Sequence, residues 1–327
     1  MNGSTITGFV LLGFTSSHTV QLLLFTLVLA CYTTTLLGNF LIMVTVLSER
    51  KLFQSPMYFF LVNLSLLDMF LGSVGTPKLV ADLLNNGSTI SYGSCMAQLY
   101  FLHIFGGTEI LLLTIMGYDR YLAICHPLRY KAIMDREHCF RLLTVCWTVG
   151  FIHGTMQIVA ITRLPFCGLN VLDNFFCDIP QVIKLACSDN SVVELVMFVN
   201  ASLIILPCFL SLLSSYVIIL ATFCGRFGKG GRKAFSTCGS HLTVVSLFYS
   251  SIVFVYLKLF STSKVDKIAS VFYMVITPAL NPLIYSLRNQ EMKAAMGKLK
   301  IKCKLLLLPQ RKDICENSFP CKRRCCA

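Results

Sequence analysis

The sequence predicts an all-α membrane protein, a bundle of seven transmembrane helices followed by a short amphipathic eighth helix. The chain has 327 residues, of which 55% are hydrophobic and only 13% are charged, whereas a soluble protein carries about 25% charged residues. Seven apolar runs are each long enough, at about 18 residues or more, to cross the hydrocarbon core. Every backbone polar group in that core needs an internal partner, so each run is expected to be a helix.

The seven spans are expected at about 21–47, 56–77, 95–118, 142–162, 195–224, 234–257 and 268–287. Residues 1–20 contain no Lys or Arg, whereas eleven follow from Arg288 to the end. Lys and Arg mark the cytoplasmic side. The pattern therefore predicts an extracellular N-terminus and a cytoplasmic tail over 288–327. In that tail, basic and apolar residues alternate and predict an amphipathic helix over about 289–302, held on the inner leaflet by anionic lipids.

The third span carries most of the chemistry. It starts at Cys95, contains one acid, Glu109, and closes on Asp119, Arg120 and Tyr121. Arg120 at the cytoplasmic edge is expected to pair with Asp119 in one state and to release it in another, which makes a two-state latch. The simpler alternative is that Arg120 only anchors the helix at the inner surface.

Two acids lie near the middle of spans, Asp68 and Glu109. Ionisable groups at this depth are costly and indicate function. Together they predict a sodium site, the alternative being protonated carboxyl groups that are merely hydrogen-bonded. The last span ends in Asn281-Pro282-Leu283-Ile284-Tyr285, where the proline permits a kink that is able to move Tyr285.

Four of the sixteen cysteines fall on the predicted outer side: Cys95, Cys167, Cys177 and Cys187. On an oxidising face they predict two disulfides, with three connectivities open. Free thiols or a zinc site are the alternatives. Two N-glycosylation sequons begin at Asn2 and Asn86, both on the same side.

Several motifs resemble those of the olfactory receptors, class II tetrapod-type, within the rhodopsin-like (class A) G-protein-coupled receptors. They are PMYFFLVNLSLLD at 56–68, MGYDRYLAICHPLRY at 116–130, Ser215-Tyr216, KAFSTCGSHL at 233–242 and PALNPLIYSLRN at 278–289. Small departures are Gly117, where the family usually has alanine, and Ser250, where glycine is common.

The resemblance implies several further properties. Cys95 pairs with Cys177, and Cys167 with Cys187. Arg120, Tyr216 and His241 belong to the activation switch, which acts with Asn281, Pro282 and Tyr285. The receptor couples to a stimulatory, olfactory-type G protein that raises cyclic AMP, and it lies in the plasma membrane of olfactory neuron cilia.

A ligand pocket is expected in the outer half of the bundle, between the third, fifth, sixth and seventh spans. On the third span, His103, Gly106 and Gly107 share a face; the glycines are expected to leave room for a ligand, with His103 as its polar contact or bonded to a neighbouring carbonyl. The other candidates are Leu102, Asn200, Ile204, Tyr249, Ile252, Val253, Tyr256, Tyr273, Met274 and Thr277. The set is apolar with a few hydrogen-bonding groups, which favours a small, neutral volatile.

Other function classes fit less well. The net charge of +13 would suit nucleic acid, but the basic residues lie between apolar runs and in the tail, so no nucleic-acid partner is expected. A transporter or channel would use the intramembrane acids as an ion path, yet the spans show no internal repeat. An intramembrane enzyme would need paired aspartates or an HExxH motif, and the chain is therefore not expected to be an enzyme.

Overall fold

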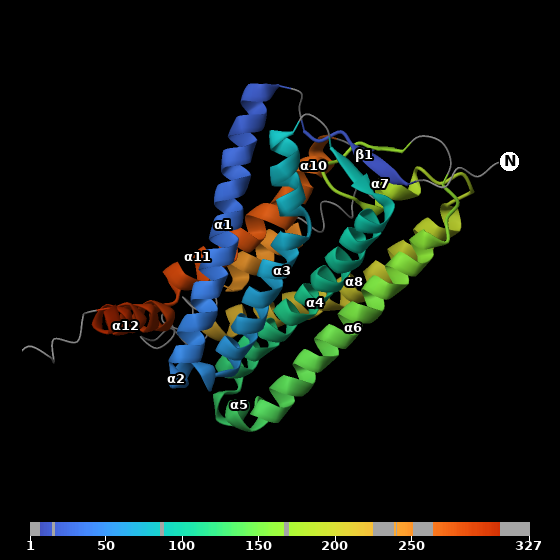
Figure 1. Cartoon of the computed structure of the whole chain (residues 1–327). Coiled ribbons are helices and arrows are strands. Elements are labelled where there is room, and N and C mark those ends of the chain that lie inside the picture. The colour runs from blue at the N-terminus through green and yellow to red at the C-terminus, as the bar shows by residue number, and fades with distance from the viewer. Residues whose placement is uncertain are drawn as a thin grey trace, which may run out of the picture.

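A computed structural model describes residues 7–14, 17–85, 88–166, 170–224, 239, 241–250 and 264–307. Among these residues, six helical segments are long and apolar enough to cross a membrane. They are α1 (His18–Ser48), α3 (Pro56–Leu84), α4 (Tyr92–Cys125), α6 (Arg136–Thr162), α8 (Ser191–Cys224) and a continuous segment built from α10 (Lys264–Val271), η1 (Phe272–Ile276) and α11 (Thr277–Arg288). They run side by side as a bundle (Figure 1).

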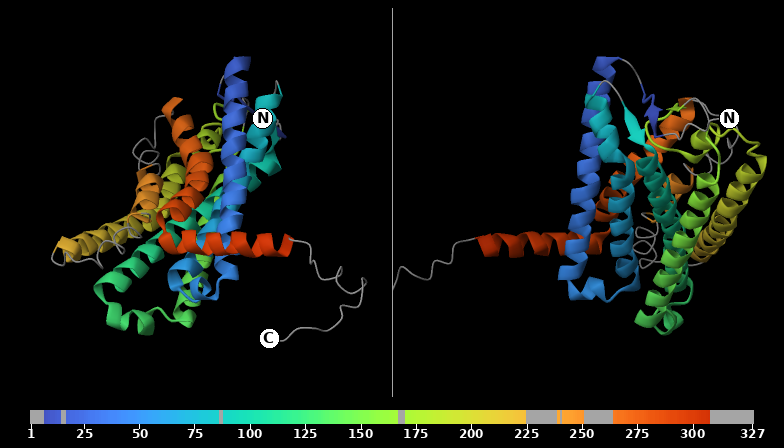
Figure 2. Two further views of the ribbon diagram at one scale, coloured as in Figure 1. Left: turned by 90° about the vertical axis from the view of Figure 1, so that its left-hand side faces the viewer. Right: turned by 45° about the vertical axis from the view of Figure 1, so that its right-hand side comes forward.

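The described part of the sixth predicted span is the apolar helix His241–Ser250. Short helices join the long ones at one end: α2 (Arg50–Phe53) and α5 (Pro127–Ile133). This is called the α5 end below. The last helix, α12 (Gln290–Leu307), leaves the bundle crosswise instead of continuing it (Figure 2). The arrangement matches the predicted seven-helix bundle with its amphipathic helix.

Several helices extend beyond the predicted spans because their capping residues lie further out in the sequence. Ser91 caps α4 by accepting a hydrogen bond from the Ser94 amide at 3.2 Å, and Asp135 caps α6 by accepting from the His138 amide at 2.7 Å. The helix α3 passes through Pro77 and continues to Leu84. Hydropathy marks the membrane-embedded part of a helix, whereas caps mark where the backbone leaves helical geometry.

A small sheet covers the other end of the bundle, called the sheet end below. Its strands β1 (Gly8–Leu11), β2 (Thr89–Ser91) and β3 (Val171–Leu172) stand in the order β2-β1-β3. The central strand β1 is antiparallel to β2 and parallel to β3. Lys267 from α10 ties this end further, donating to the Gly13 carbonyl at 3.0 Å and to Asp173 at 2.6 Å. The N-terminal segment is thus joined to three later parts of the chain.

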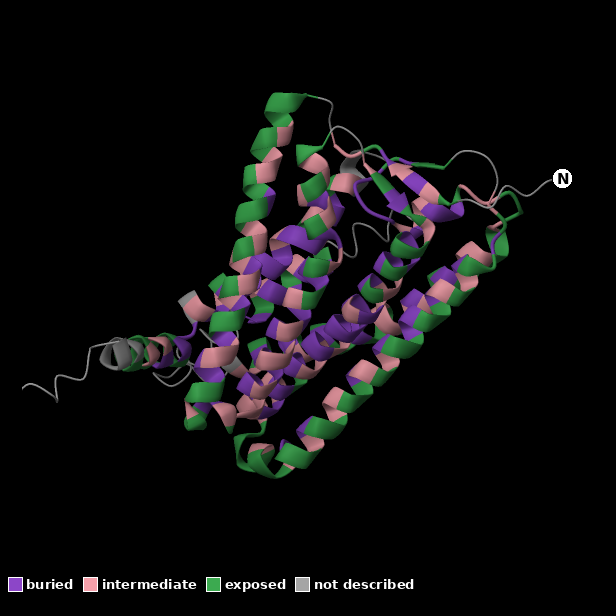
Figure 3. Cartoon of the chain, viewed as in Figure 1, coloured by how far each residue is buried: buried purple, intermediate pink, exposed green. Residues whose placement is uncertain are grey.

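The helix α4 is the centre of the bundle, and buried residues follow most of its length (Figure 3). It lies closest to α6, where glycines replace side chains. A Cβ on Gly154 would come within 3.1 Å of the Ile104 amide nitrogen, and a Cβ on Gly107 within 3.7 Å of the Gly150 Cα. Small residues four apart allow two membrane helices to approach this closely. In contrast, α1 exposes a mainly apolar surface, as a lipid-facing helix does.

The last span contains a π-helical turn, η1, that the sequence did not predict. The amide of Thr277 donates to the Phe272 carbonyl five residues earlier, directly before Pro278, which has no N–H to donate. The side-chain amide (Nδ2) of Asn39, on α1, donates a hydrogen bond to the Pro278 carbonyl at 3.2 Å. The wider turn and this contact set the position of α11, which carries Asn281 and Tyr285.

Asn289 separates α11 from α12 and starts the crosswise helix. Its Oδ1 accepts hydrogen bonds from the amides of Glu291 at 3.0 Å and Met292 at 3.2 Å, and from the Tyr58 hydroxyl at 3.1 Å. Tyr58 lies in the first turns of α3. The start of α12 is therefore fixed both by a side-chain cap and by a neighbouring transmembrane helix.

Candidate functional site

Asp68 and Glu109 are buried at the same level between α3, α4 and α11. The side-chain amide (Nδ2) of Asn281 donates to both carboxylate oxygens of Asp68, at 2.9 and 3.1 Å. Glu109 is 1% exposed, and among the described residues neither of its carboxylate oxygens has a hydrogen-bond partner. The two carboxyl groups lie close enough to interact electrostatically. The carboxyl group of Asp68 therefore has a hydrogen-bond donor, whereas that of Glu109 has none among the described residues.

Three other buried oxygens, on α1, α3 and α11, also have no hydrogen-bond partner among the described residues: Asn39 Oδ1, Ser65 Oγ and Asn281 Oδ1. Hard cations are bound by carboxylate, amide and hydroxyl oxygens. Oxygens of this kind around two acids have the chemistry of a sodium site, so the residues present fit such an ion.

The latch residues lie at the α5 end of α4. Arg120 donates to Asp119 through Nε at 2.9 Å and also through a terminal guanidinium nitrogen. The hydroxyl of Tyr130, on α5, donates to the other oxygen of Asp119 at 2.7 Å. Burial and the charge of Asp119 raise the pKa of Tyr130 above its usual value, so the hydroxyl keeps the proton that it donates. The structure shows the Asp119–Arg120 pair that the sequence predicts.

Tyr121 has a different role from its two neighbours in the triplet. Its hydroxyl bonds to His126 Nε2 at 3.0 Å, at the junction between α4 and α5. It therefore contributes to the turn that carries α5, and hence Tyr130, back to Asp119.

Three of the remaining predicted switch residues, Tyr216, His241 and Tyr285, lie near Arg120. The Tyr216 hydroxyl bonds to His241 Nδ1, and the two rings stack with centroids 6.0 Å apart. Both His241 and Tyr285 lie within electrostatic reach of Arg120. Pro282 sits against α1, where a Cβ on Gly38 would come within 2.9 Å of it. Residues from four helices, α4, α8, the His241–Ser250 helix and α11, thus meet at this end of the bundle.

The predicted ligand face of α4 is more crowded than expected. A Cβ on Gly106 would collide with the Tyr273 hydroxyl, and one on Gly107 would come within 3.2 Å of the His153 ring. Protein side chains fill the space beside both glycines, which corrects the expectation that this space is open. The two glycines also face different neighbours: Gly106 faces the last span, and Gly107 faces α6.

His103 adopts the alternative arrangement that the sequence left open. Its Nδ1 bonds to the Leu99 carbonyl at 2.8 Å, and its ring lies 5.9 Å from that of His153. His103 thus faces α6, not the sixth and seventh spans as expected. The remaining ring nitrogen, Nε2, is the one left to meet a ligand.

Met274 is a second correction. Its terminal carbon would come within 2.5 Å of a Cβ on Gly75, so the side chain is directed at α3. The π-helical turn changes the angular spacing along this span, which is why helical counting misplaced it. Met274, Leu102 and Val275 pack with Phe175 and Phe176.

The other described pocket candidates belong to the core. Tyr249 lies 5.5 Å from the Phe209 ring, and Tyr273 lies 5.7 Å from the Phe248 ring. Ile204 packs against the same cluster, and Thr277 is buried. The candidates Ile252, Val253 and Tyr256 lie outside the described residues, as do Asn2 and Asn86.

Sequence reasoning missed two polar residues of α6, His153 and Gln157. Both are buried, and among the described residues His153 Nδ1 and Gln157 Oε1 have no hydrogen-bond partner. The Asn200 side chain from α8 interacts with His153. The two positions are four apart, hence on one face of a helix, and polar side chains inside a span are the signal that would have found them.

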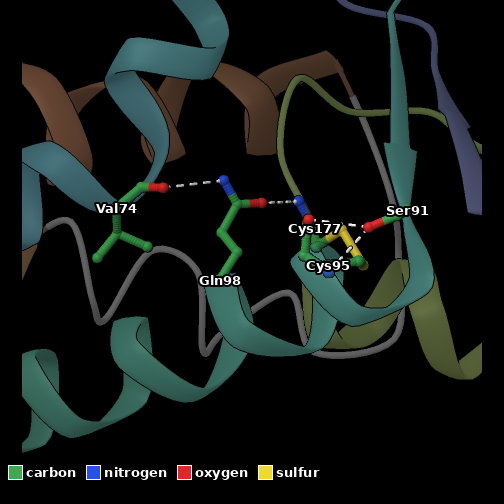
Figure 4. The surroundings of a disulfide bond; sticks show 6 residues. Val74, Ser91, Cys95, Gln98 and Cys177 are labelled. Carbon is green, nitrogen blue, oxygen red and sulfur yellow. Dashed lines mark hydrogen bonds between the residues drawn. A yellow bond between two sulfur atoms is a disulfide. The ribbon is translucent and has the colours of Figure 1, made fainter.

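The sheet end is fixed by a disulfide between Cys95 and Cys177, whose Cα atoms are 5.5 Å apart. Gln98 holds the loop beside it, accepting from the Cys177 amide at 2.8 Å and donating to the Val74 carbonyl at 3.2 Å (Figure 4). The implied Cys95–Cys177 pairing is confirmed. Cys187 is also disulfide-bonded, and its expected partner Cys167 lies outside the described residues.

Comparisons with known proteins agree with this arrangement. The family model described as "Olfactory receptor" matches residues 28–303. Human olfactory receptor 4Q3 is 55% identical over 91% of this chain and 96% of its own length, and human olfactory receptor 4Q2 is 51% identical over 90% and 93%. Mouse olfactory receptor 4E2 is 46% identical over 92% and 97%. The chain is therefore a multi-pass membrane receptor and not an enzyme, and it belongs to the olfactory receptor family.

Proposed function

We propose that this receptor binds a small, neutral volatile between α4, α6 and α8, in the half of the bundle nearer the sheet end. The observation that carries the proposal is the cluster of His103, His153, Gln157 and Asn200. It contains uncharged hydrogen-bonding groups, and two of their buried atoms, His153 Nδ1 and Gln157 Oε1, have no partner among the described residues. Leaving such groups unpaired costs about 1–3 kcal/mol each, and a ligand with one hydroxyl or carbonyl group would relieve that cost.

The chemistry of the cluster also argues against a charged ligand. Between Cys95 and Asp119, the single charged residue on α4 is Glu109, which lies deeper beside Asp68. An amine ligand would need an acid within the cluster to offset its desolvation. A neutral volatile needs only a hydrogen bond and an apolar wall.

The sheet end is proposed to face the cell exterior, and the α5 end the cytoplasm. Basic residues gather at the α5 end and on α12, among them Arg50, Lys51, Arg129, Lys131 and Lys293, in line with the positive-inside rule. The disulfides lie at the other end, as an oxidising exterior requires. The proposed location is the plasma membrane of olfactory neuron cilia.

The G protein is proposed to be of the stimulatory, olfactory type, so that activation raises cyclic AMP. The odorant would bind the active state more tightly and shift a two-state equilibrium. In the paired form, Asp119 holds Arg120; in the active form, Arg120 is released toward Tyr216 and Tyr285, and the α5 end opens for the G protein. Arg120→Ala would then abolish the cyclic AMP response at normal surface expression, and a normal response would contradict the latch.

The direct test is a cyclic AMP reporter screen with a broad panel of volatiles, with surface staining as a control. The variants are His103→Ala and Gln157→Leu, with Met156→Leu as the matched control because Met156 is exposed on the other side of α6. We expect an odorant that activates the wild type and the control but has about tenfold lower potency on both pocket variants, or about 1.4 kcal/mol. Unchanged potency on both would place the ligand elsewhere.

A sodium ion is proposed between Asp68 and Glu109, with the unpaired oxygens of Asn39, Ser65 and Asn281 as further ligands. Bound sodium would stabilise the folded receptor by mass action. Raising sodium at constant ionic strength, with choline as the replacement cation, should raise the unfolding temperature of the wild type but not of Glu109→Gln. An equal rise in both would rule out this site.

A further inference from the structure

A groove of about 780 Å³ lies between α3 and α4 in the half of the molecule nearer the sheet end. It is separate from the proposed odorant site, because its residues face outward from the bundle. Phe70 and Phe101 on its walls are 43% and 45% exposed. In a multi-pass membrane protein these outward positions meet lipid, so whatever fills the groove comes from the membrane.

The deeper part of the groove is aromatic. The Phe105 ring stacks on Phe70 with centroids 5.3 Å apart at an interplanar angle of 27°, and on Phe101 at 5.8 Å and 18°. Stacking holds the three rings against one another, so this wall of the groove is rigid. A rigid occupant loses less conformational entropy on such a wall than a flexible acyl chain does, which favours a molecule with a rigid apolar body.

The end of the groove beneath β2 is polar but carries no net charge. Lys78 forms an ion pair with Asp82 within one turn of α3, and the Lys78 Nζ atom lies 3.5 Å from the Ser88 hydroxyl. Ser91 and Ser94 complete this end, with their hydroxyl groups 2.8 Å apart. Since Asp82 neutralises Lys78, this end does not favour an anionic headgroup, but it offers hydroxyl and ammonium donors to a single neutral polar group.

The length of the groove matches one leaflet. From Phe70 to Lys78 the helix rises by about 12 Å, and half of the hydrocarbon core is about 15 Å. The polar end lies toward the membrane surface and the aromatic part toward its middle. An occupant therefore has one polar end, a rigid apolar body and the length of a single leaflet.

We propose that this groove binds a membrane sterol, with its hydroxyl group among Lys78, Ser91 and Ser94 and its ring system against Phe70, Phe101 and Phe105. The floor of the groove includes Gln98, which bridges Val74 and the Cys177 amide (Figure 4). A bound sterol would thus press on the side chain that holds the disulfide loop, and it would stabilise the sheet end.

The test is photolabelling of the full-length receptor in phosphatidylcholine nanodiscs that contain a diazirine analogue of cholesterol. Labelled peptides are identified by mass spectrometry. We expect label to concentrate on peptides from 70–82 and 91–105, and excess cholesterol to compete for it. Ala97→Trp, which fills the groove from an exposed position, should lower the labelling at least about fivefold, equivalent to about 1 kcal/mol.

The matched control is Val159→Trp, which adds the same bulk to a lipid-facing position of α6 and should leave the labelling unchanged. Phe101→Ala serves as a second groove variant should Ala97→Trp fail to reach the folded state, and it should also lower the labelling. Equal labelling of the lipid faces of α1 and α6, or labelling that neither groove variant lowers, would overturn the proposal. Stronger labelling of the groove by a diazirine phosphatidylcholine than by the sterol would overturn the choice of sterol.

Discussion

Asp119 is the residue on which the proposed latch depends. It is fully buried, and its two oxygens accept from different elements, Oδ2 from Arg120 on the same helix and Oδ1 from Tyr130 on α5. A hydrogen bond to a charged acceptor contributes about 1.5–3 kcal/mol. The helix α5 therefore helps to decide whether Asp119 remains paired.

Removing the Tyr130 hydroxyl should weaken the paired form. For Tyr130→Phe we expect cyclic AMP without odorant to rise severalfold, because an unpaired oxygen of Asp119 destabilises the resting arrangement more than the active one. The measurement is basal reporter activity at matched surface expression. Tyr118→Phe, on a tyrosine of α4 that is 38% exposed, is the control; basal activity no higher than in this control would show that Tyr130 does not hold the latch.

Residue-level prediction identified the charged groups but missed several packing contacts. Asp68, Glu109 and Arg120 are recognisable in the sequence because a charge inside or at the edge of a span is costly. The burial of Met274 against α3 was not predicted, because Met274 lies inside a π-helical turn, whose wider spacing ordinary helical counting does not include. The glycine at position 117, where the family usually has alanine, is explained by close packing. A Cβ there would come within 2.5 Å of a Leu212 methyl carbon.

At the scale of elements, the contact between α4 and α6 sets the position of the proposed odorant site. Gly150 and Gly154 lie on the face of α6 that meets α4, and His153 lies between them in the sequence. Small residues four apart are the signature of close packing between membrane helices. The same approach that packs the helices also brings His153 to His103.

Gly150→Ala should separate these two helices. The added Cβ would collide with the Thr108 hydroxyl and come within 2.9 Å of the Ile104 carbonyl, and the backbone atom cannot rotate away. We expect a loss of about 1–3 kcal/mol, typical of overpacking, seen as a lower unfolding temperature and less receptor at the surface. Gly93→Ala is the control because no heavy atom lies within 4 Å of its Cβ position; equal stability of the two variants would contradict the close contact.

Long elements were predictable, and short ones were not. Seven apolar runs identify the spans because hydrocarbon permits few alternatives to a helix. The strands contain two to four residues each, too few for an alternating pattern to be read. Their pairing partners lie far apart in the sequence, so no local signal joins them.

At the scale of the whole molecule, the sheet end connects the N-terminal segment to the rest of the receptor. Residues on β1 pair with β2 and β3, Phe9 is buried against Tyr92 and Phe166, and Lys267 reaches Gly13. The fold class of this molecule followed from composition and hydropathy. The closure of its sheet end did not, because it rests on contacts between distant segments.

Val10→Pro tests whether β1 contributes to global stability. The Val10 amide donates to the Asn170 carbonyl at 2.8 Å, and proline has no N–H to donate. Loss of that bond and of the local strand should lower the unfolding temperature by a few degrees. Val10→Ala keeps the amide and should lie close to the wild type; a Val10→Pro receptor as stable as Val10→Ala would show that the strand is dispensable.

The central position of β1 has a consequence for biosynthesis. The strand is made before its partners, residues 89–91 and 171–172, so the ribosome must produce the four long helices α1, α3, α4 and α6 before the sheet is complete. During that time β1 is an unpaired strand with an exposed edge, the kind of segment that chaperones recognise and that aggregates. The part of the receptor that leaves the ribosome first is thus among the last to reach its final structure.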